Sequence, residues 1–292
     1  MRRHRRLTDV LAVPIIICVI AACVIAACAP ASTRQDRDLP ATPHPSATAP
    51  TGHDPGSTSA GGKARLGKAA GPGTSAGGGS RTSTAAARYS WTNVAAHDDF
   101  SGSTLDQSWG AYDSAGNAGK GIRSPKQIGL HDGVLRMTGT AGGTTAGMSW
   151  RRPQRYGRWE IRARFPAGCE CYHPVLILWP AEDPWPVGGE IDYAEVFDAG
   201  RQKLNFFLHY TADNKQLYGT KQIDMTRWHN FAVEWTPDHV TGYVDGQQFF
   251  HTDRRDVLPP GPMNPTVQLD WFPGATKGGA TLELEWATIY RL

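Results

Sequence analysis

Three carboxylates within six residues are the feature that most limits how this chain can fold. Glu190, Asp192 and Glu195 lie in a run, Gly188 to Glu195, that is otherwise apolar and prone to form a β-strand. Side chains alternate between the two faces of a strand, so Glu190 and Asp192 share one face and a regular strand places Glu195 on the other. We predict a β-bulge at Tyr193-Ala194, because one extra residue returns Glu195 to the face of Glu190.

Acids grouped in this way have a known chemical use. At about 3.3 Å per residue the two Glu backbones are roughly 13 Å apart, and their side chains can lean towards the ~5 to 5.5 Å carboxyl gap of a retaining glycosidase. In that reaction one carboxylate attacks the anomeric carbon, and the other protonates the leaving oxygen and later deprotonates water. Two other interpretations stay open: an acidic strand that faces solvent without function, and a calcium site.

The same residues carry a resemblance to a known family. Glu190 to Glu195 resembles the E-x-D-x-x-E signature of glycoside hydrolase family 16, in the bulged form of laminarinase-like members. Further segments are similar to the strands around that site and to the opening and closing segments, namely Tyr156 to Arg164, Trp228 to Asp238, Tyr243 to Gly246, Asp98 to Gly102 and Leu284 to Tyr290. The resemblance covers about residues 88–292.

The resemblance implies a fold and roles for the three acids. The fold is a β-jelly-roll sandwich of the concanavalin A type, with the site across its concave face. By position, Glu190 would be the nucleophile, Asp192 its helper and Glu195 the acid/base. The chain departs from the family where a Trp-Pro-x-x-Trp run often precedes the catalytic strand, because His173 to Ile177 stand there, with Trp179 two residues on.

Many short alternating segments separated by turn residues predict an all-β sandwich. They include Val134 to Met137, Trp159 to Arg164, Leu204 to Tyr210, Phe231 to Trp235 and Thr281 to Trp286. Asp245-Gly246 is a strong hairpin signal between two such segments. No long helical period appears anywhere.

Ten tryptophans are many for a chain of this size, and aromatic rings offer wide rigid surfaces to the apolar faces of sugars. Trp185, five residues before Glu190, is the first candidate platform. The other candidates for contact with substrate are Trp179, His209, Gln268 and Trp271. Gln268 and Asp270 alternate onto one face. Trp159, Trp235 and Trp286 lie in strand patterns, so we expect them in the core.

The first 87 residues do not read as globular. Four arginines precede an apolar run from Val10 to Ala27, which fits an export signal over residues 1–28. Ile25 to Cys28 resembles a bacterial lipobox, with Cys28 as the acylated residue. Ile20 to Cys23 fits equally well, and an ordinary cleaved signal or an uncleaved anchor stays open. Residues 29–87 are rich in Pro, Ser, Thr, Gly and Ala and predict a disordered tether. The catalytic domain then spans 88–292.

Charge and cysteine usage agree with this division. Residues 1–87 hold ten Lys or Arg and four Asp or Glu, so the remainder of the 30 and 27 is 20 and 23, a net charge of −3. The basic balance therefore belongs to the N-terminal segment, and the folded part gives no sign of nucleic-acid binding. Three of the five cysteines lie in the signal. Cys169 and Cys171 form either a disulfide, after the turn at Pro166 to Gly168, or two free thiols.

These observations predict an exported or surface-tethered, monomeric, retaining endo-glycosidase that hydrolyses a β-1,3- or β-1,3/1,4-glucan. We expect no cofactor, with a structural calcium ion left open, and contact with a membrane only through the N-terminal signal or lipid. A transglycosylase would use the same residues. A non-catalytic carbohydrate-binding protein is the alternative from another class, and a structural envelope lipoprotein explains the tether but not the acids.

Overall fold

The computed structural model describes residues 83–182 and 185–292. The predicted signal at 1–28, Cys28 and the predicted tether as far as residue 82 lie outside this part of the chain. Within the described ranges, no helix combines the length and the apolar character that crossing a membrane requires.

Strands dominate the described residues, and they form two large sheets and one small one. The first sheet has seven strands in the order β13-β12-β11-β10-β17-β8-β2, which are Lys215–Gln222, Lys203–Tyr210, Glu190–Glu195, Tyr172–Pro180, Met263–Trp271, Gly147–Trp150 and Trp109–Ala111. The second runs β16-β15-β14-β9-β18-β6-β5, which are Gln247–Thr252, Val240–Val244, His229–Trp235, Gly157–Arg164, Ala280–Tyr290, Val134–Gly139 and Ile128–His131, with β1 (Val94–Asp98) also paired to β18.

The remaining elements are short. The small sheet joins β3, β4 and β7, which are Ser114–Ala115, Ile122–Arg123 and Thr144–Thr145. One α-helix is described, α1 at Ala85–Tyr89, together with the 3₁₀ turns η2, η3 and η4 at Asn117–Gly119, Pro125–Gln127 and Arg255–Val257. The expected all-β sandwich is confirmed.

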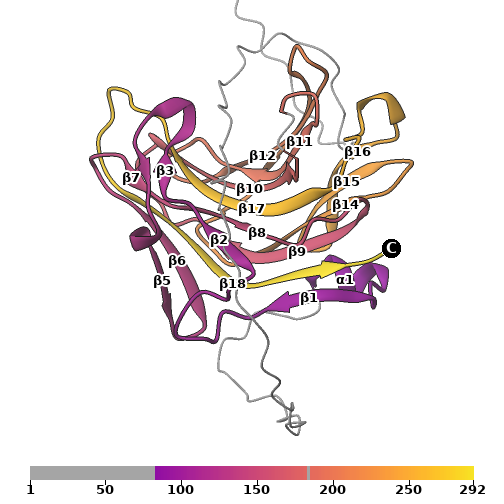
Figure 1. Cartoon of the computed structure of the whole chain (residues 1–292), viewed down its shortest axis with the longest axis horizontal. Helices are drawn as coiled ribbons and strands as arrows, with labels where there is room; N and C mark the ends of the chain where they lie inside the picture. Colours follow the sequence, from indigo (N-terminus) through magenta and orange to yellow (C-terminus); the bar gives the residue numbers. More distant parts are fainter. Residues whose placement is uncertain (1–82, 183–184) are drawn as a thin grey trace, which may run out of the picture. The chain divides into compact units, whose positions relative to one another are not determined.

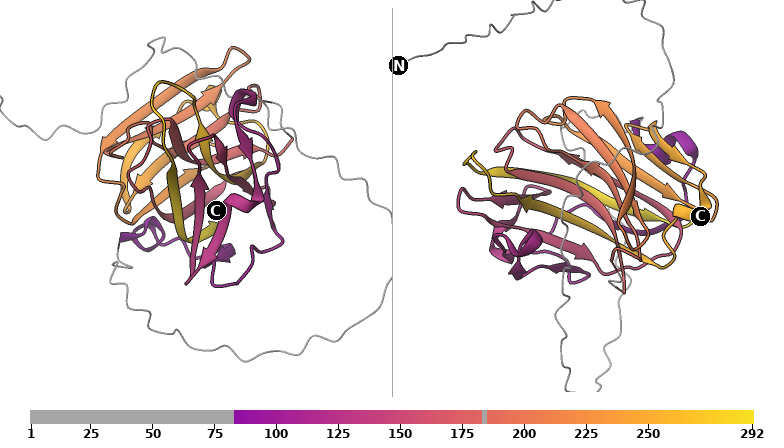
Figure 2. Two further views of the ribbon diagram at one scale, coloured as in Figure 1. Left: turned by 90° about the vertical axis from the view of Figure 1, so that its left-hand side faces the viewer. Right: turned by 90° about the horizontal axis from the view of Figure 1, so that it is seen from above.

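The two large sheets pack face to face as stacked layers (Figures 1 and 2). Alternation along the strands explains the packing, because every second residue joins the core. On β12 these are Leu204, Phe206 and Leu208, and on β10 they include Leu176 and Leu178. The residues between them face outward. The seven-stranded sheet curves so that its outer face is concave (Figure 1), and we call this outer face the site face.

The predicted strands and the predicted hairpin are present, and two of the three tryptophans expected in the core lie there. Asp245 and Gly246 both have positive φ, 50° and 68°, as the two-residue turn between β15 and β16 requires. Trp159 and Trp235 are core residues, at 1% and 0% exposure. The expectation for Trp286 was wrong. The register of β18 shifts between Leu284 and Trp286, so Trp286 turns to the outer face and lies half-buried.

The sandwich also holds the last residues of the predicted tether. Residues 83–87 are described, and α1 packs on the outer face of the second sheet with Ala85 fully buried. Glu160 on β9 is itself fully buried and accepts hydrogen bonds from the N–H groups of Ala85 and Ala86, at 2.6 and 3.1 Å. Folded structure therefore begins before residue 88, where we had placed the start of the domain.

Glu160 makes the stability of the sandwich depend on pH. Burial raises its pKa to about 7, although the two helix N–H groups act in the opposite direction. The pKa of Glu160 is higher in the folded than in the unfolded protein. Its contribution to the free energy of unfolding is therefore complete below about pH 4.5 and is lost as pH rises through 7, with a magnitude of about 3 kcal/mol. We expect the free energy of unfolding of wild type to fall by about that amount relative to Glu160→Gln between pH 4.5 and 8, measured by urea titration. Parallel pH profiles would contradict the assignment.

The segment that enters β10 is pinned by a disulfide and a buried arginine. Cys169 and Cys171 are bonded, which settles the choice that the sequence left open. Arg201 is fully buried and donates hydrogen bonds to the backbone carbonyls of Cys169, Tyr172 and Asp198, at 3.0 to 3.1 Å. The guanidinium thus joins the β10 entry to the turn that follows β11.

Candidate active site

The predicted bulge in β11 is present at the predicted residues. Against β10, Asp192 pairs with Ile177 and Ala194 pairs with Leu176, so Tyr193 is the extra residue. The pairing with β12 shifts between Asp192 and Glu195 as well. Ile191, Tyr193 and Ala194 point into the core. Glu190, Asp192 and Glu195 consequently share the site face, as the predicted bulge requires.

Glu190 stands at the start of β11, directly after a glycine in the left-handed region. Gly189 has φ 74°, which a residue with a side chain adopts only with strain. The Glu190 carboxylate is fully buried, and its Oε2 accepts a hydrogen bond from Trp185 Nε1 at 2.8 Å. Burial, followed by the charge of Asp192, raises the pKa of Glu190 well above its usual value, while His209 and Trp185 act to lower it.

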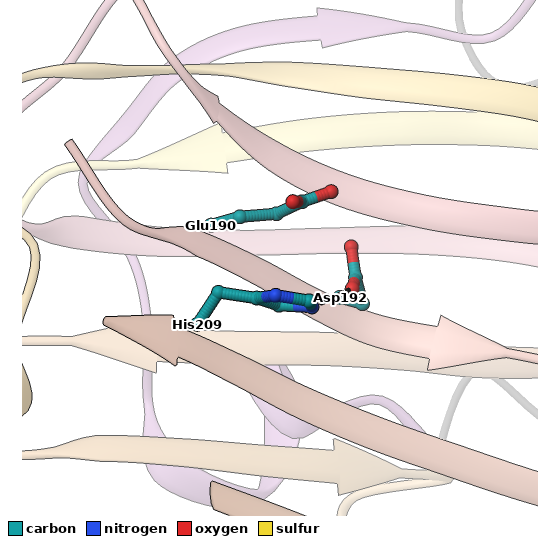
Figure 3. Close-up of side chains that lie close together, drawn as sticks. All are labelled: Glu190, Asp192 and His209. Atoms are coloured by element: carbon teal, nitrogen blue, oxygen red, sulfur yellow. Dashed lines mark hydrogen bonds and ion pairs between the residues drawn. The ribbon is translucent and has the colours of Figure 1, made fainter. Parts of the chain in front are cut away.

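Asp192 lies beside Glu190 and is held from the next strand. His209 on β12 points towards Asp192 (Figure 3), with Nε2 3.1 Å from Asp192 Oδ2. Its Nδ1 lies 2.8 Å from Asn214 Oδ1. The pKa of Asp192 is raised to about 8, chiefly by burial, although the interaction with Glu190 acts in the opposite direction. The same interaction raises the pKa of Glu190. Two adjacent buried carboxyl groups with raised pKa values are therefore suited to share one proton.

Glu195 is 2% exposed and lies among further acids. Burial raises its pKa well above the usual value, and the charges of Asp192, Glu190 and Asp270 add to the effect. His173 on β10 places Nδ1 3.9 Å from Glu195 Oε1. Its ring lies between Phe197 and Phe272, with centroids 4.7 and 4.1 Å away. A buried carboxyl group with a raised pKa is suited to donate a proton near neutral pH.

The cluster also offers ligand atoms to a metal ion. Glu190, Asp192 and His209 each place one such atom within 4.8 Å of the others, among the residues that the structure describes. Two carboxylates and an imidazole suit a transition metal better than calcium, which takes six to eight oxygen ligands. The donor set thus fits calcium poorly.

The predicted substrate contacts fall in two places. Trp179 and Trp185 stack beside Glu190, with centroids 6.3 Å apart and planes at 13°, and both are half-buried. His209 is 1% exposed and lies against Asp192, so it is placed to orient that carboxylate. Gln268 and Trp271 lie on β17, which pairs with β10 on the side away from β11. Gln268 is buried and Trp271 is half-buried.

Sequence reasoning did not find Arg123, which reaches the site face from β4. Its Nη2 lies 2.5 Å from Gln268 Oε1 and 2.5 Å from Asp270 Oδ1, and the Arg123 and Asp270 side chains are 5% and 2% exposed. This pair influences the electrostatics of the site, because the charge of Asp270 raises the pKa of both Asp192 and Glu195. The only signal in the sequence was Asp270, an acid that alternates onto one face with Gln268. It did not indicate which basic residue would pair with it.

The hydrogen bond from Trp185 gives a test of the electrostatics at Glu190. Trp185→Phe keeps the stacked ring but removes the N–H that favours the ionised carboxylate. The pKa of Glu190 then rises further, so we expect the acidic limb of kcat/KM to move to higher pH and kcat/KM at pH 6 to fall about tenfold or more. Trp228→Phe, on the second sheet's side near Arg162 and Arg164, is the control. Superimposable profiles for both variants would contradict this assignment.

Comparison with known proteins gives consistent results. Residues 117–288, more than half of the 292-residue chain, match the family described as Glycosyl hydrolases family 16. A glucan endo-1,3-beta-glucosidase of Cryptopygus antarcticus is 32% identical over 38% of this chain and 44% of its own length. A beta-glucanase of Rhodothermus marinus is 30% identical over 36% and 40%. The matched stretch thus spans less than half of each relative.

A solved structure supports the fold. The laminarinase catalytic domain of Thermotoga maritima superimposes with a TM-score of 0.62 at 19% identity, over 68% of this chain and 98% of that domain. At this identity the likeness concerns the fold alone. The family match and the shared jelly roll together establish that this chain is a member of glycoside hydrolase family 16.

Proposed function

We propose that the chain is a retaining endo-glycosidase that hydrolyses β-1,3-glucan or mixed β-1,3/1,4-glucan. The observation that carries the proposal is the bulge in β11, which turns Glu190, Asp192 and Glu195 to one face in a buried setting. Family membership and relatives named for endo-1,3-beta-glucosidase and beta-glucanase activity support the reaction and the substrate class.

In the first step Glu190 attacks the anomeric carbon, and the glycosidic C–O bond breaks as Glu195 gives its proton to the leaving oxygen. Glu195 remains protonated near neutral pH because burial and neighbouring carboxylates raise its pKa. The reaction requires the proton of the Glu190–Asp192 pair to move to Asp192, which leaves Glu190 ionised. His209 and Trp185 act in that direction, since both lower the pKa of Glu190, against burial and the charge of Asp192.

In the second step a water molecule gives a proton to the Glu195 carboxylate and attacks the anomeric carbon. The ester bond to Glu190 breaks and both glutamates return to their starting states. Two displacements at one carbon retain the β configuration. A sugar hydroxyl in place of water would give transglycosylation with the same residues.

The setting of the enzyme follows from the N-terminal segment. An export signal with Cys28 as a lipid attachment point, followed by a Pro- and Gly-rich tether, would place a monomeric catalytic domain at the cell surface. A polysaccharide is too large to enter a cell, which agrees with a site outside the membrane. We propose no cofactor for the reaction.

The test is release of reducing ends by the full chain from laminarin, mixed-linkage glucan, agarose and carrageenan. We expect hydrolysis of laminarin, of mixed-linkage glucan or of both. Hydrolysis of only the galactans would overturn the substrate assignment. Binding of laminarin without release of reducing ends or transfer products would favour a carbohydrate-binding protein.

A further inference from the structure

A short segment at the start of the described residues crosses the outer face of the second sheet, on the side of the sandwich away from the site face (Figure 1). We call this segment, residues 83–91, the strap, and it contains α1. Its buried side chains join a hydrophobic cluster that is separate from the one between the sheets and consists of Ala85, Trp91, Ala232, Tyr243 and Tyr290. A helix of five residues is not stable by itself, so the fold of the strap depends on this docking.

The strap covers a buried acid. Glu160 on β9 is fully buried, and its two carboxyl oxygens accept hydrogen bonds from the N–H groups of Ala85 and Ala86. Among the residues that the structure describes, both donors to Glu160 therefore belong to the strap. The cross-strand neighbours of Glu160 are Ala232 and Thr288, which are also buried. Departure of the strap would thus open the Glu160 carboxyl group to water without opening the main core.

Within the described ranges, no cation forms an ion pair with Glu160. Besides the two tyrosines of the cluster, the titratable and charged side chains on the elements packed around it are Arg88, Arg158, Arg162, His229, Glu234 and Asp245. Each basic strand residue is paired with another acid, in the pairs Arg158–Glu234, Arg162–Glu285 and His229–Asp245. Arg88 lies over the ring of Tyr89. The charge of Asp245 acts on Glu160 in the direction that opposes ionisation.

Burial without a paired cation makes the charged form of Glu160 costly, and this cost disappears once the strap has left. The pKa of Glu160 is accordingly raised to about 7 while the strap is docked, chiefly by burial, whereas a carboxyl group open to water ionises near the usual 4.5. Because the docked value is the higher one, docking is strongest below about pH 4.5 and weakens as pH rises through 7. The geometry thus couples the proton on Glu160 to the position of the strap.

We propose that the strap is a pH-sensitive latch, which protonated Glu160 holds on the second sheet and which ionised Glu160 releases while the sandwich stays folded. Release converts residues 83–91 from a docked segment into free chain. Nine extended residues span up to about 30 Å, so the folded domain would gain that much reach from the chain that precedes Ser83. The inference is independent of the proposed glycosidase activity, because the strap lies on the sheet that does not carry the three acids.

The test is hydrogen exchange of the backbone amides in the strap, measured on the full chain by mass spectrometry at pH 5 and pH 8. Each rate is divided by the intrinsic exchange rate at that pH, so that only the protection by structure remains. We expect the protection of the strap in wild type to fall about fiftyfold between pH 5 and pH 8. Strand β12, which lies in the other large sheet, is the internal reference and should keep its protection.

Glu160→Gln is the matched variant, because it keeps the size of the side chain and an oxygen that accepts hydrogen bonds but cannot ionise. It also retains the His229–Asp245 pair, so titration of that pair cancels from the comparison. The protection of its strap should change by no more than about threefold between the two pH values.

A strap in wild type that keeps its protection at pH 8, or that loses it to the same extent in Glu160→Gln, would overturn the latch. Loss of protection in β12 together with the strap would also overturn it, because the whole sandwich would then be opening. Ala85→Arg is a second variant, in case Glu160→Gln does not fold. It places a charged side chain at a fully buried position, so the strap should be unprotected at both pH values while β12 stays protected. Unfolding of β12 in that variant would show that the strap cannot leave by itself, and would contradict the latch.

Discussion

Glu190→Gln and Glu195→Gln are each expected to lower kcat on laminarin by about a thousandfold or more, because each removes a group that makes or breaks a bond at the anomeric centre. Both glutamates lie buried on β11. Glu160→Gln is the matched control, since Glu160 is an equally buried strand glutamate on the second sheet. Assayed at pH 6, it should keep the wild-type kcat.

An aryl glycoside with a good leaving group separates the two roles. Its first step needs no proton from an acid, so Glu195→Gln should still release the phenol in a burst and then stall as a glycosyl-enzyme. Glu190→Gln should release none, because no nucleophile remains. A burst from Glu190→Gln and none from Glu195→Gln would reverse the assignment.

The second large effect is expected on stability. Arg201→Ala removes a buried guanidinium that donates to the carbonyls of Cys169, Tyr172 and Asp198. Burial already lowers the pKa of Arg201 to about 10, but the three carbonyls have been taken out of water with it and would lose this donor. We expect a loss of about 3 to 5 kcal/mol in the free energy of unfolding.

The measurement is urea denaturation followed by tryptophan fluorescence, beside Arg255→Ala as control, because the Arg255 side chain is 74% exposed. The control should change the free energy of unfolding by less than about 0.5 kcal/mol. A loss below about 1 kcal/mol for Arg201→Ala would show that water replaces the guanidinium, and that this residue does not pin the entry to β10.

How far the sequence leads is clearest at β11. Strand parity alone required an extra residue between Asp192 and Glu195, since three acids cannot otherwise share a face, and the register shows it at Tyr193. The alternation of side chains did not reveal the irregularity in β18. A second bulge there, between Leu284 and Trp286, has no acid to reveal it, and Trp286 was wrongly placed in the core.

Contacts between distant segments were beyond the sequence. Arg123 reaches Asp270 across 147 residues, and Glu160 binds the start of α1 across 75. The residues around Arg123 and those of α1 show no local pattern that identifies Asp270 or Glu160 as the partner. The alanine-rich residues before Arg88 read as tether, because their burial depends on a carboxylate far along the chain.

The central claim is that Glu190 and Glu195 act on one anomeric carbon by two displacements. The most direct measurement is the anomeric configuration of the first product released from a laminari-oligosaccharide, followed by ¹H NMR before mutarotation. The account predicts the β anomer at early times, with the α anomer appearing only later. An α anomer as the first product would show single-displacement inversion and would contradict it.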